Sequence, residues 1–218
     1  MNSDEFYETQ YKDLMSGGPI GAYWKKIHRN LEKPFNKFTY GRVLELGAGN
    51  GEHFDSVRCG FDEYFMTDLR IDGLLKFNGR NKAIVTEVQD VNQLTYEDEF
   101  FDRILITCVL VHLAEPEKAL AEMHRVAKKG AHISIYVPCE PGALLRLVRR
   151  FSTRLKARKM GIANISTLHF QEHRTYFLAI DQFIRDEFRN CNIRRAAYPF
   201  RFLSWNFNLY KIYQIEVN

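Results

Sequence analysis

The segment VLELGAGNG, from Val43 to Gly51, decides the fold. Its apolar residues predict a short buried strand, which runs directly into the spacing Gly47-x-Gly49-x-Gly51. Glycines tolerate positive φ angles and let a ligand approach the backbone closely. In an open α/β sheet, ligands bind beyond the carboxyl ends of the strands, and this loop lies there. The segment therefore predicts a ligand-binding sheet edge, against the plainer alternative of a tight turn.

Four more apolar runs, at residues 63–67, 83–88, 101–107 and 132–137, predict further strands. Apolar residues at helical spacing predict a helix over residues 117–128, closed by Lys128, Lys129 and Gly130. Strands that alternate with helices indicate a parallel sheet. Residues 193–200 and 207–217 are strands too close in sequence for a crossover, so we expect an antiparallel pair at one edge. The fold class is therefore α/β, a Rossmann-like doubly wound sheet, mostly parallel with a C-terminal antiparallel hairpin.

The chain is expected to form one domain over residues 1–218. Residues 1–39 read as an N-terminal helical cap, with helices at 4–14 and 22–31 separated by Ser16-Gly17-Gly18-Pro19. Residues 40–138 are the predicted cofactor-binding core. Residues 139–218 are an acceptor-side insertion, with helices at 144–156 and 175–189, followed by the hairpin.

The composition is that of a soluble globular protein, with 45% hydrophobic and 27% charged residues. The net charge of +4 does not by itself indicate nucleic-acid binding. Four widely spaced cysteines predict reduced thiols, and no Cys/His cluster has metal-ligand spacing, so no metal is expected. The sequence shows neither a signal peptide nor a long apolar run, and we expect a cytoplasmic protein.

Acidic residues around the glycines distinguish between cofactors. A dinucleotide fingerprint has its third glycine one position after Gly51, where Glu52 stands here and would repel a pyrophosphate. Asp68 follows the second strand, where a ribose is read, and Glu45 is a costly carboxylate inside a buried strand. S-adenosylmethionine has no phosphate, and its sulfonium and ammonium groups suit carboxylates. No P-loop sequence is present.

The glycine loop and the segments after the following strands resemble those of the class I methyltransferases, in particular the group of ubiquinone/menaquinone and small-molecule methyltransferases. The resemblance covers residues 40–138 and rests on five segments in order: VLELGAGNGEH, FMTDL, VQDVNQL, FDRILITCVLVHL and EKALAEMHRVAKKGAHISIYVP. It implies S-adenosylmethionine as the cofactor. The last third of the chain matches this group only in layout.

The resemblance implies roles for individual residues. Gly47, Ala48, Gly49 and Gly51 would line the methionine moiety, while Asp68, followed by Leu69, would accept both ribose hydroxyls. Asp90 and Val91 would hold the adenine, and Cys108 would present its backbone to the amino-acid group. Glu45 would orient the loop or a bridging water. The alternative to a ligand-binding role for Asp68 and Asp90 is that each is simply an acidic loop residue exposed to solvent.

Histidines in two segments suggest a general base, which is needed only if the acceptor must lose a proton. His112 follows the fourth strand, where the family often places a histidine near the acceptor; alternatively it packs and supports the loop. His169, His173 and Arg174 lie in the segment HFQEHRTYF, which could bind an acceptor or act as a cap and lid. Tyr11 is a further candidate, closing over the cofactor from the cap.

Residues 142–171 contain no acid. They combine a basic face that includes Arg149 with an apolar stripe at helical spacing, so residues 142–159 could meet an anionic membrane, a phosphate-bearing acceptor, RNA or only water. The preferred interpretation is a methyltransferase of a small molecule or glycan, by O-methylation of a phosphate-bearing or lipid-linked sugar. The alternatives are an RNA methyltransferase, which the mild charge elsewhere disfavours, and a non-catalytic cofactor-binding subunit.

Overall fold

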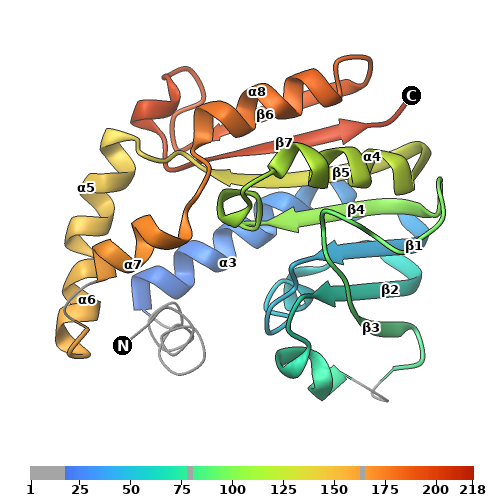
Figure 1. The fold of residues 1–218 in the computed structure, drawn as a ribbon, viewed down its shortest axis with the longest axis horizontal. Coiled ribbons are helices and arrows are strands. Elements are labelled where there is room, and N and C mark those ends of the chain that lie inside the picture. The colour runs from blue at the N-terminus through green and yellow to red at the C-terminus, as the bar shows by residue number, and fades with distance from the viewer. Residues whose placement is uncertain (1–17, 78–80, 163–164) are drawn as a thin grey trace.

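The computed structural model describes residues 18–77, 81–162 and 165–218, and its centre is a seven-stranded sheet. The strand order is β3-β2-β1-β4-β5-β7-β6 (Figure 1). The first five strands are parallel, and β6 and β7 pair antiparallel beside β5. The predicted fold class is confirmed, including the hairpin at one edge. The strands are β1 (Thr39–Leu46), β2 (Gly60–Asp68), β3 (Ile84–Val88), β4 (Phe101–Thr107), β5 (Ala127–Pro138), β6 (Asn192–Tyr198) and β7 (Tyr210–Glu216).

Helices cover the two faces of the sheet unequally (Figure 1). On one face α4 (Pro116–Val126) and α8 (Phe177–Glu187) pack against apolar side chains such as Leu44, Ile104 and Ile133. On the other face lie α3 (Gly18–Glu32) and three 3-10 turns, η1 (Lys33–Phe35), η2 (Phe54–Ser56) and η3 (Asp72–Phe77). Within the described part of the chain, the glycine loop is followed by η2 alone and by no α-helix. A pyrophosphate would therefore find no helix dipole here, which adds to the objection raised by Glu52.

Several predicted boundaries were wrong. The helix expected to end at Lys128–Gly130 ends at Val126, because Ala127 already pairs with Phe101 and begins β5. The single basic helix expected over 144–156 is two helices, α5 (Ala143–Phe151) and α6 (Thr153–Lys159). They break at Ser152, whose Oγ donates to the Val148 carbonyl at 2.8 Å.

Other boundaries shift less. The helix expected over residues 22–31 is α3, which begins four residues earlier, at Gly18. Another helix, α7 (Ile165–Glu172), was not predicted from the sequence. The helix expected over 175–189 is α8. The helix expected over residues 4–14 lies outside the described residues.

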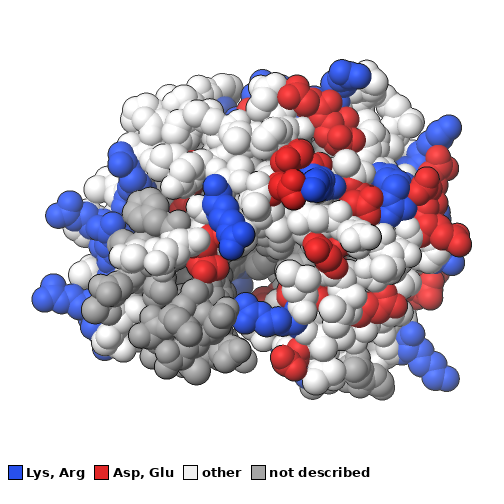
Figure 2. All heavy atoms as spheres, viewed as in Figure 1, with Lys and Arg blue, Asp and Glu red and all other residues white. Residues whose placement is uncertain are grey.

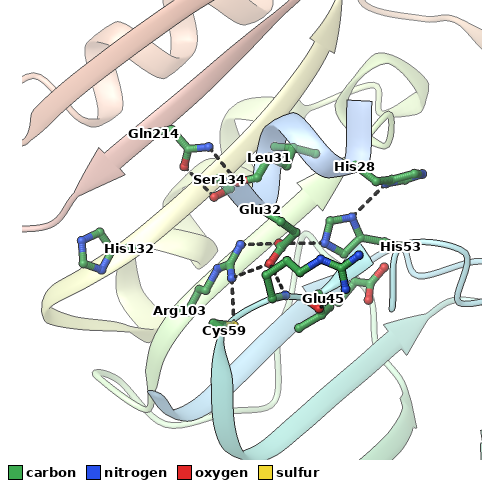
Figure 3. A network of polar contacts seen from close by, with 12 residues as sticks. His28, Leu31, Glu32, Glu45, His53, Cys59, Arg103, His132, Ser134 and Gln214 are labelled. Carbon is green, nitrogen blue, oxygen red and sulfur yellow. Dashed lines mark hydrogen bonds and ion pairs between the residues drawn. The ribbon is translucent and has the colours of Figure 1, made fainter. Parts of the chain in front are cut away.

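A buried ion pair joins α3 to the middle of the sheet (Figure 3). Arg103 in β4 points toward the last residue of α3, Glu32, and their Nη2 and Oε1 atoms are 2.5 Å apart. Both side chains are fully buried. His53 Nε2, from the loop after β1, lies 3.0 Å from the same carboxylate, and the Phe35 ring packs on the guanidinium at 4.2 Å. Burial raises the pKa of Glu32, but the hydrogen bonds from His53 and Arg103 prevail and lower it to about 2.

We expect Arg103→Met to reduce the free energy of unfolding by about 3–5 kcal/mol, because it leaves the Glu32 carboxylate buried without its cation. The double variant Glu32→Leu/Arg103→Met should lose much less than the sum of the two single variants, as apolar groups fill the same space. Urea unfolding at pH 7 measures both. Lys118→Met removes an exposed pair with Glu115 and should leave the urea unfolding midpoint unchanged, because solvent screens such a pair. If Arg103→Met and Lys118→Met lost the same free energy of unfolding, the buried pair would not be a special contributor to stability.

Candidate functional site

The glycine loop is shaped by packing on one side and open on the other. Gly47, Gly49 and Gly51 all have positive φ angles. A Cβ atom on Gly47 would lie 2.1 Å from Val109 Cγ2, so the loop packs closely against the segment after β4. Among the described residues, a Cβ atom on Gly49 would meet only Glu52 Oε2, at 3.8 Å. The backbone at Gly49 is therefore the point of this loop that a ligand can approach.

Asp68, at the end of β2, reaches the glycine loop. Its Oδ2 accepts a hydrogen bond from Gly49 N at 2.9 Å, and its Oδ1 accepts one from Arg70 N at 3.0 Å. A carboxylate has about four lone-pair positions, so each oxygen keeps one for a ligand hydroxyl. Leu69, next in the chain, is 65% exposed and lies on the same edge. The ribose contact that the sequence predicts for Asp68 stays a prediction, and the position of the carboxylate at the glycine loop is compatible with it.

Asp90 and Val91 follow β3 at the next position along the edge. Asp90 is exposed, and its Oδ1 accepts from Asn92 N at 2.9 Å, which fixes the turn. Val91 is buried in the core below it. After β4, Cys108 adopts a positive φ of 61°, a strained conformation for a residue with a side chain. Burial raises the pKa of its thiol to about 11, so the group is a neutral thiol at pH 7.

Glu45 has a structural partner. Its buried Oε2 accepts a hydrogen bond from the Tyr64 hydroxyl at 2.8 Å, and burial raises the pKa of the carboxyl. The side chain projects to the face covered by α3, near His53 (Figure 3). Its described contacts therefore support the sheet beneath the glycine loop. Ala48, also buried, packs in the same apolar cluster as Tyr64.

A cavity of about 150 Å³ lies beyond the carboxyl ends of β4 and β5. We call it the acceptor cavity. The α3 helix forms one wall and α5 the opposite wall. Aromatic rings dominate the first wall, and the polar groups face them. The lining includes Tyr23, Trp24, Tyr136, Cys108, His112, His173 and Arg149.

The polar side of the cavity is organised by a carboxylate that sequence reasoning missed. Glu140, just after β5, is buried and forms an ion pair with Arg149 through Oε1. Its Oε2 accepts a hydrogen bond from His173 Nδ1. The His112 ring packs edge-on against His173, with centroids 4.7 Å apart, and its Nδ1 lies 3.2 Å from the Glu172 carbonyl. Four residues, one from α5 and three from the segments that follow β4, β5 and α7, thus form one cluster.

Both histidines are neutral at pH 7. Burial, together with the neighbouring His173, lowers the pKa of His112 to about 4. Burial and the Arg149 guanidinium lower the pKa of His173 to about 4 as well. A neutral imidazole that donates from Nδ1 has an acceptor lone pair at Nε2. The cavity therefore holds two imidazoles able to accept a proton.

The structure brings together some of the predicted acceptor-side residues and separates others. His112, His173 and Arg149 meet in the cavity. Arg174 does not line it: its backbone N donates to the Val111 carbonyl at 2.8 Å, and its side chain is exposed. The backbone of His169 belongs to α7, but its side chain lies outside the described part, as does all of Tyr11.

The missed residues carried weak sequence signals. Glu140 is the last acid before the acid-free stretch and directly follows a strand, a position like those of the predicted cofactor acids. Tyr23 and Trp24 fall in the predicted cap helix, where aromatic residues are equally expected to pack on the core. Only the path of α3 across the sheet places them at the cavity.

The fold and the edge geometry define the class of the protein. Residues 44–135 match the family described as a methyltransferase domain. Together with the curated relatives and the shared fold described below, this match supports a class I, S-adenosylmethionine-dependent methyltransferase domain. It is 31% identical over 132 residues to the ubiquinone/menaquinone biosynthesis C-methyltransferase of Cupriavidus taiwanensis. That match covers 56% of this chain and 52% of the relative, so the chain spans about half the length of the curated relatives it matches.

Solved structures share the whole fold at low identity. The N-methyltransferase NodS from Bradyrhizobium japonicum, in complex with S-adenosyl-L-homocysteine, matches at 13% identity with a TM-score of 0.66, covering 99% of this chain and 96% of that one. A chain of the Haloferax volcanii complex between the Trm112 methyltransferase activator and a methyltransferase matches at 13% identity and a TM-score of 0.67, covering 99% and 97%. These likenesses extend the shared fold beyond residues 44–135 to nearly the full chain.

Two further observations concern the described residues only. No group of His, Cys, Asp or Glu among them is arranged to hold a metal ion. None of their helices has the length and apolar character needed to cross a bilayer.

We expect Asp68→Ala to weaken S-adenosylmethionine binding by about 10- to 100-fold, because hydrogen bonds to a charged group contribute about 1.5–3 kcal/mol. Isothermal titration calorimetry measures the affinity. Asp62→Ala is the matched control, since Asp62 is an exposed acid at the opposite end of the same strand. An unchanged affinity in Asp68→Ala would refute the ribose assignment.

Stability should fall as the pH drops from about 6.5 to about 4. In that window an unfolded imidazole binds a proton, whereas folded His112 and His173 do not, so each contributes up to about 1.4 kcal/mol per pH unit. Urea unfolding of the wild type and of the His112→Asn variant at several pH values tests this. The variant should show a shallower slope; identical slopes would mean that His112 titrates normally.

Proposed function

We propose that this protein transfers a methyl group from S-adenosylmethionine to a small acceptor bound in the acceptor cavity. The observation that carries the proposal is the position of this cavity. It opens beside Cys108 at the same sheet edge as Asp68 and the glycine loop, and it holds two neutral imidazoles and a guanidinium between aromatic walls. Such a pocket suits a substrate that needs orientation and the removal of one proton.

The residues at the sheet edge fit the cofactor. Asp68 has free lone pairs for the ribose hydroxyls, and Asp90 with Val91 offers an acceptor beside an apolar surface for the adenine. The open side of Gly49 and the backbone of Cys108 flank the space for the methionine part. When bound, S-adenosylmethionine supplies an already activated methyl group, so alignment of the acceptor can provide much of the rate.

The acceptor is proposed to be a small molecule or a glycan methylated on oxygen. Tyr23, Trp24 and Tyr136 give flat apolar contacts for a ring, and Arg149 gives a positive charge for an anionic group. A phosphate-bearing or lipid-linked sugar combines these features. The curated relatives are named as C-methyltransferases and one structural neighbour as an N-methyltransferase, so the methylated atom is a point for experiment.

His112 is proposed as the general base. Its Nδ1 lies 3.2 Å from the Glu172 carbonyl, which favours the tautomer with the proton on Nδ1, and the residue lines the cavity. Glu140 acts as a positioning residue. By accepting from His173 Nδ1 and pairing with Arg149, it fixes the ring of His173 and the direction of the guanidinium. His173 in turn packs against His112 and limits its rotation.

We expect His112→Asn to lower kcat by about 10²- to 10⁴-fold with little change in S-adenosylmethionine affinity. Glu140→Gln should lower kcat less and raise the KM for the acceptor, because it loosens both His173 and Arg149. Transfer of radiolabelled methyl groups to small-molecule, lipid, RNA and protein fractions, followed by kinetics on the active fraction, measures these effects. His124→Asn, a histidine paired with Glu187 away from the cavity, is the control and should keep wild-type rates.

Three outcomes would overturn parts of the proposal. Labelling of the RNA fraction alone would favour an RNA methyltransferase. Binding of S-adenosylmethionine without transfer to any fraction would favour a non-catalytic subunit, a role that the activator complex among the structural neighbours makes worth testing. Wild-type kcat in His112→Asn would remove the base assignment alone.

A further inference from the structure

The outer side of α5 and α6 exposes large apolar side chains. Leu147 and Phe151, one helical turn apart, are 54% and 64% exposed. Leu155 is also exposed, at 50%. The inner side of the same helices carries Leu145 and Ala157, which are buried. Each helix therefore presents an apolar surface in both directions, although one side suffices to attach it to the domain.

Cations surround this outer apolar side. No Asp or Glu occurs from Pro141 to Gln171, whereas seven Lys and Arg residues lie between Arg146 and Lys159. In Figure 2, Lys and Arg gather over α5 and α6 at the left of the molecule, and most Asp and Glu lie over the other half. The exposed apolar groups thus stand in a strongly positive field.

A second segment, far away in sequence, adds to the same end of the molecule. The β6–β7 connection at residues 199–209 exposes Phe200, Phe202, Leu203 and Phe207, and Phe202 is 99% exposed. Asn206 Oδ1 in this connection accepts from Ala143 N at 2.7 Å, which fastens it to the first residue of α5. Figure 1 shows this connection next to the upper end of α5. Arg201 places a further exposed cation beside the phenylalanines.

We propose that α5, α6 and residues 199–209 form one docking surface for an anionic lipid bilayer. Interfacial helices combine an apolar face of Leu and Phe with a polar face of Lys and Arg, and they bind through buried apolar area together with attraction to anionic lipids. The cations and the aromatic rings would also suit a nucleic acid, but the aliphatic side chains of Leu147 and Leu155 would contribute nothing to its binding. The aliphatic groups within the positive field are what favour a bilayer.

The docking surface backs directly onto the acceptor cavity. Leu145, Val148, Ser152 and Thr153 line that cavity from α5 and α6. An acceptor held in a bilayer would therefore enter beside these helices without crossing water. This route of entry rests on the proposed methyl transfer, whereas docking to the bilayer does not.

The test is cosedimentation of the full chain with vesicles, without S-adenosylmethionine or acceptor, so that its outcome is independent of methyl transfer. Vesicles of phosphatidylcholine alone are compared with vesicles containing about 30% phosphatidylglycerol, at low and high salt. We expect binding to the anionic vesicles that is at least tenfold stronger and that weakens with salt. Phe151→Glu and Phe202→Glu should each weaken it about tenfold, and Arg150→Glu/Arg158→Glu should abolish the preference for anionic lipid.

Leu75→Glu is the matched control. Leu75 is 52% exposed in η3, between β2 and β3, at the opposite edge of the sheet. It should bind vesicles like the wild type, and calorimetry with S-adenosylmethionine confirms that every variant is folded. Equal losses in Leu75→Glu and Phe151→Glu would overturn the proposal.

Three other results would also overturn it. One is the absence of binding to anionic vesicles in the full chain. Another is binding that appears only after residues 1–17 are removed, which would make that acidic segment the occupant of the surface. The third is a Phe151-dependent affinity for single-stranded RNA that exceeds the affinity for vesicles.

Discussion

The buried pair of Arg103 and Glu32 is the constraint on which the rest of the structure depends. A guanidinium inside a central strand is tolerable only if a carboxylate reaches it, and that carboxylate is the last residue of α3. The pair therefore fixes where α3 ends on the sheet. Since α3 is the only α-helix that packs on this face among the described residues near the glycine loop, its direction also decides what stands at its other end.

That other end is a wall of the acceptor cavity. Tyr23 and Trp24 project from α3 toward Tyr136 in β5, with Trp24 and Tyr136 ring centroids 5.7 Å apart. The same helix thus anchors beside the glycine loop through Glu32 and His53 and shapes the cavity through its aromatic residues. Electrostatic anchoring at one end and aromatic packing at the other couple the cofactor edge of the sheet to the acceptor side.

The two parts of the site differ in how they are built. The edge that we propose to bind the cofactor uses loops that follow β1, β2 and β3, where each contact is set by residues within a few positions of a strand end, as with Asp68 and Gly49. The acceptor cavity joins α3, the loop after β4, Glu140 after β5, α5 and the loop before α8. Its charges are therefore balanced between different segments, because Glu140 pairs with Arg149 of α5 and also contacts His173 in the loop before α8.

The sequence by itself determined the class of fold and the places along the chain of the five parallel strands and the loops that follow them, because strand periodicity and strand-end loops are local properties. It also located His112, His173 and Arg149, although without their relation to one another. Only the tertiary structure decided that Glu140 links them, that α3 supplies the aromatic wall, and that Arg174 points away. Those facts depend on which segments meet across the sheet, and a buried carboxylate is recognised only when both of its distant partners are in place.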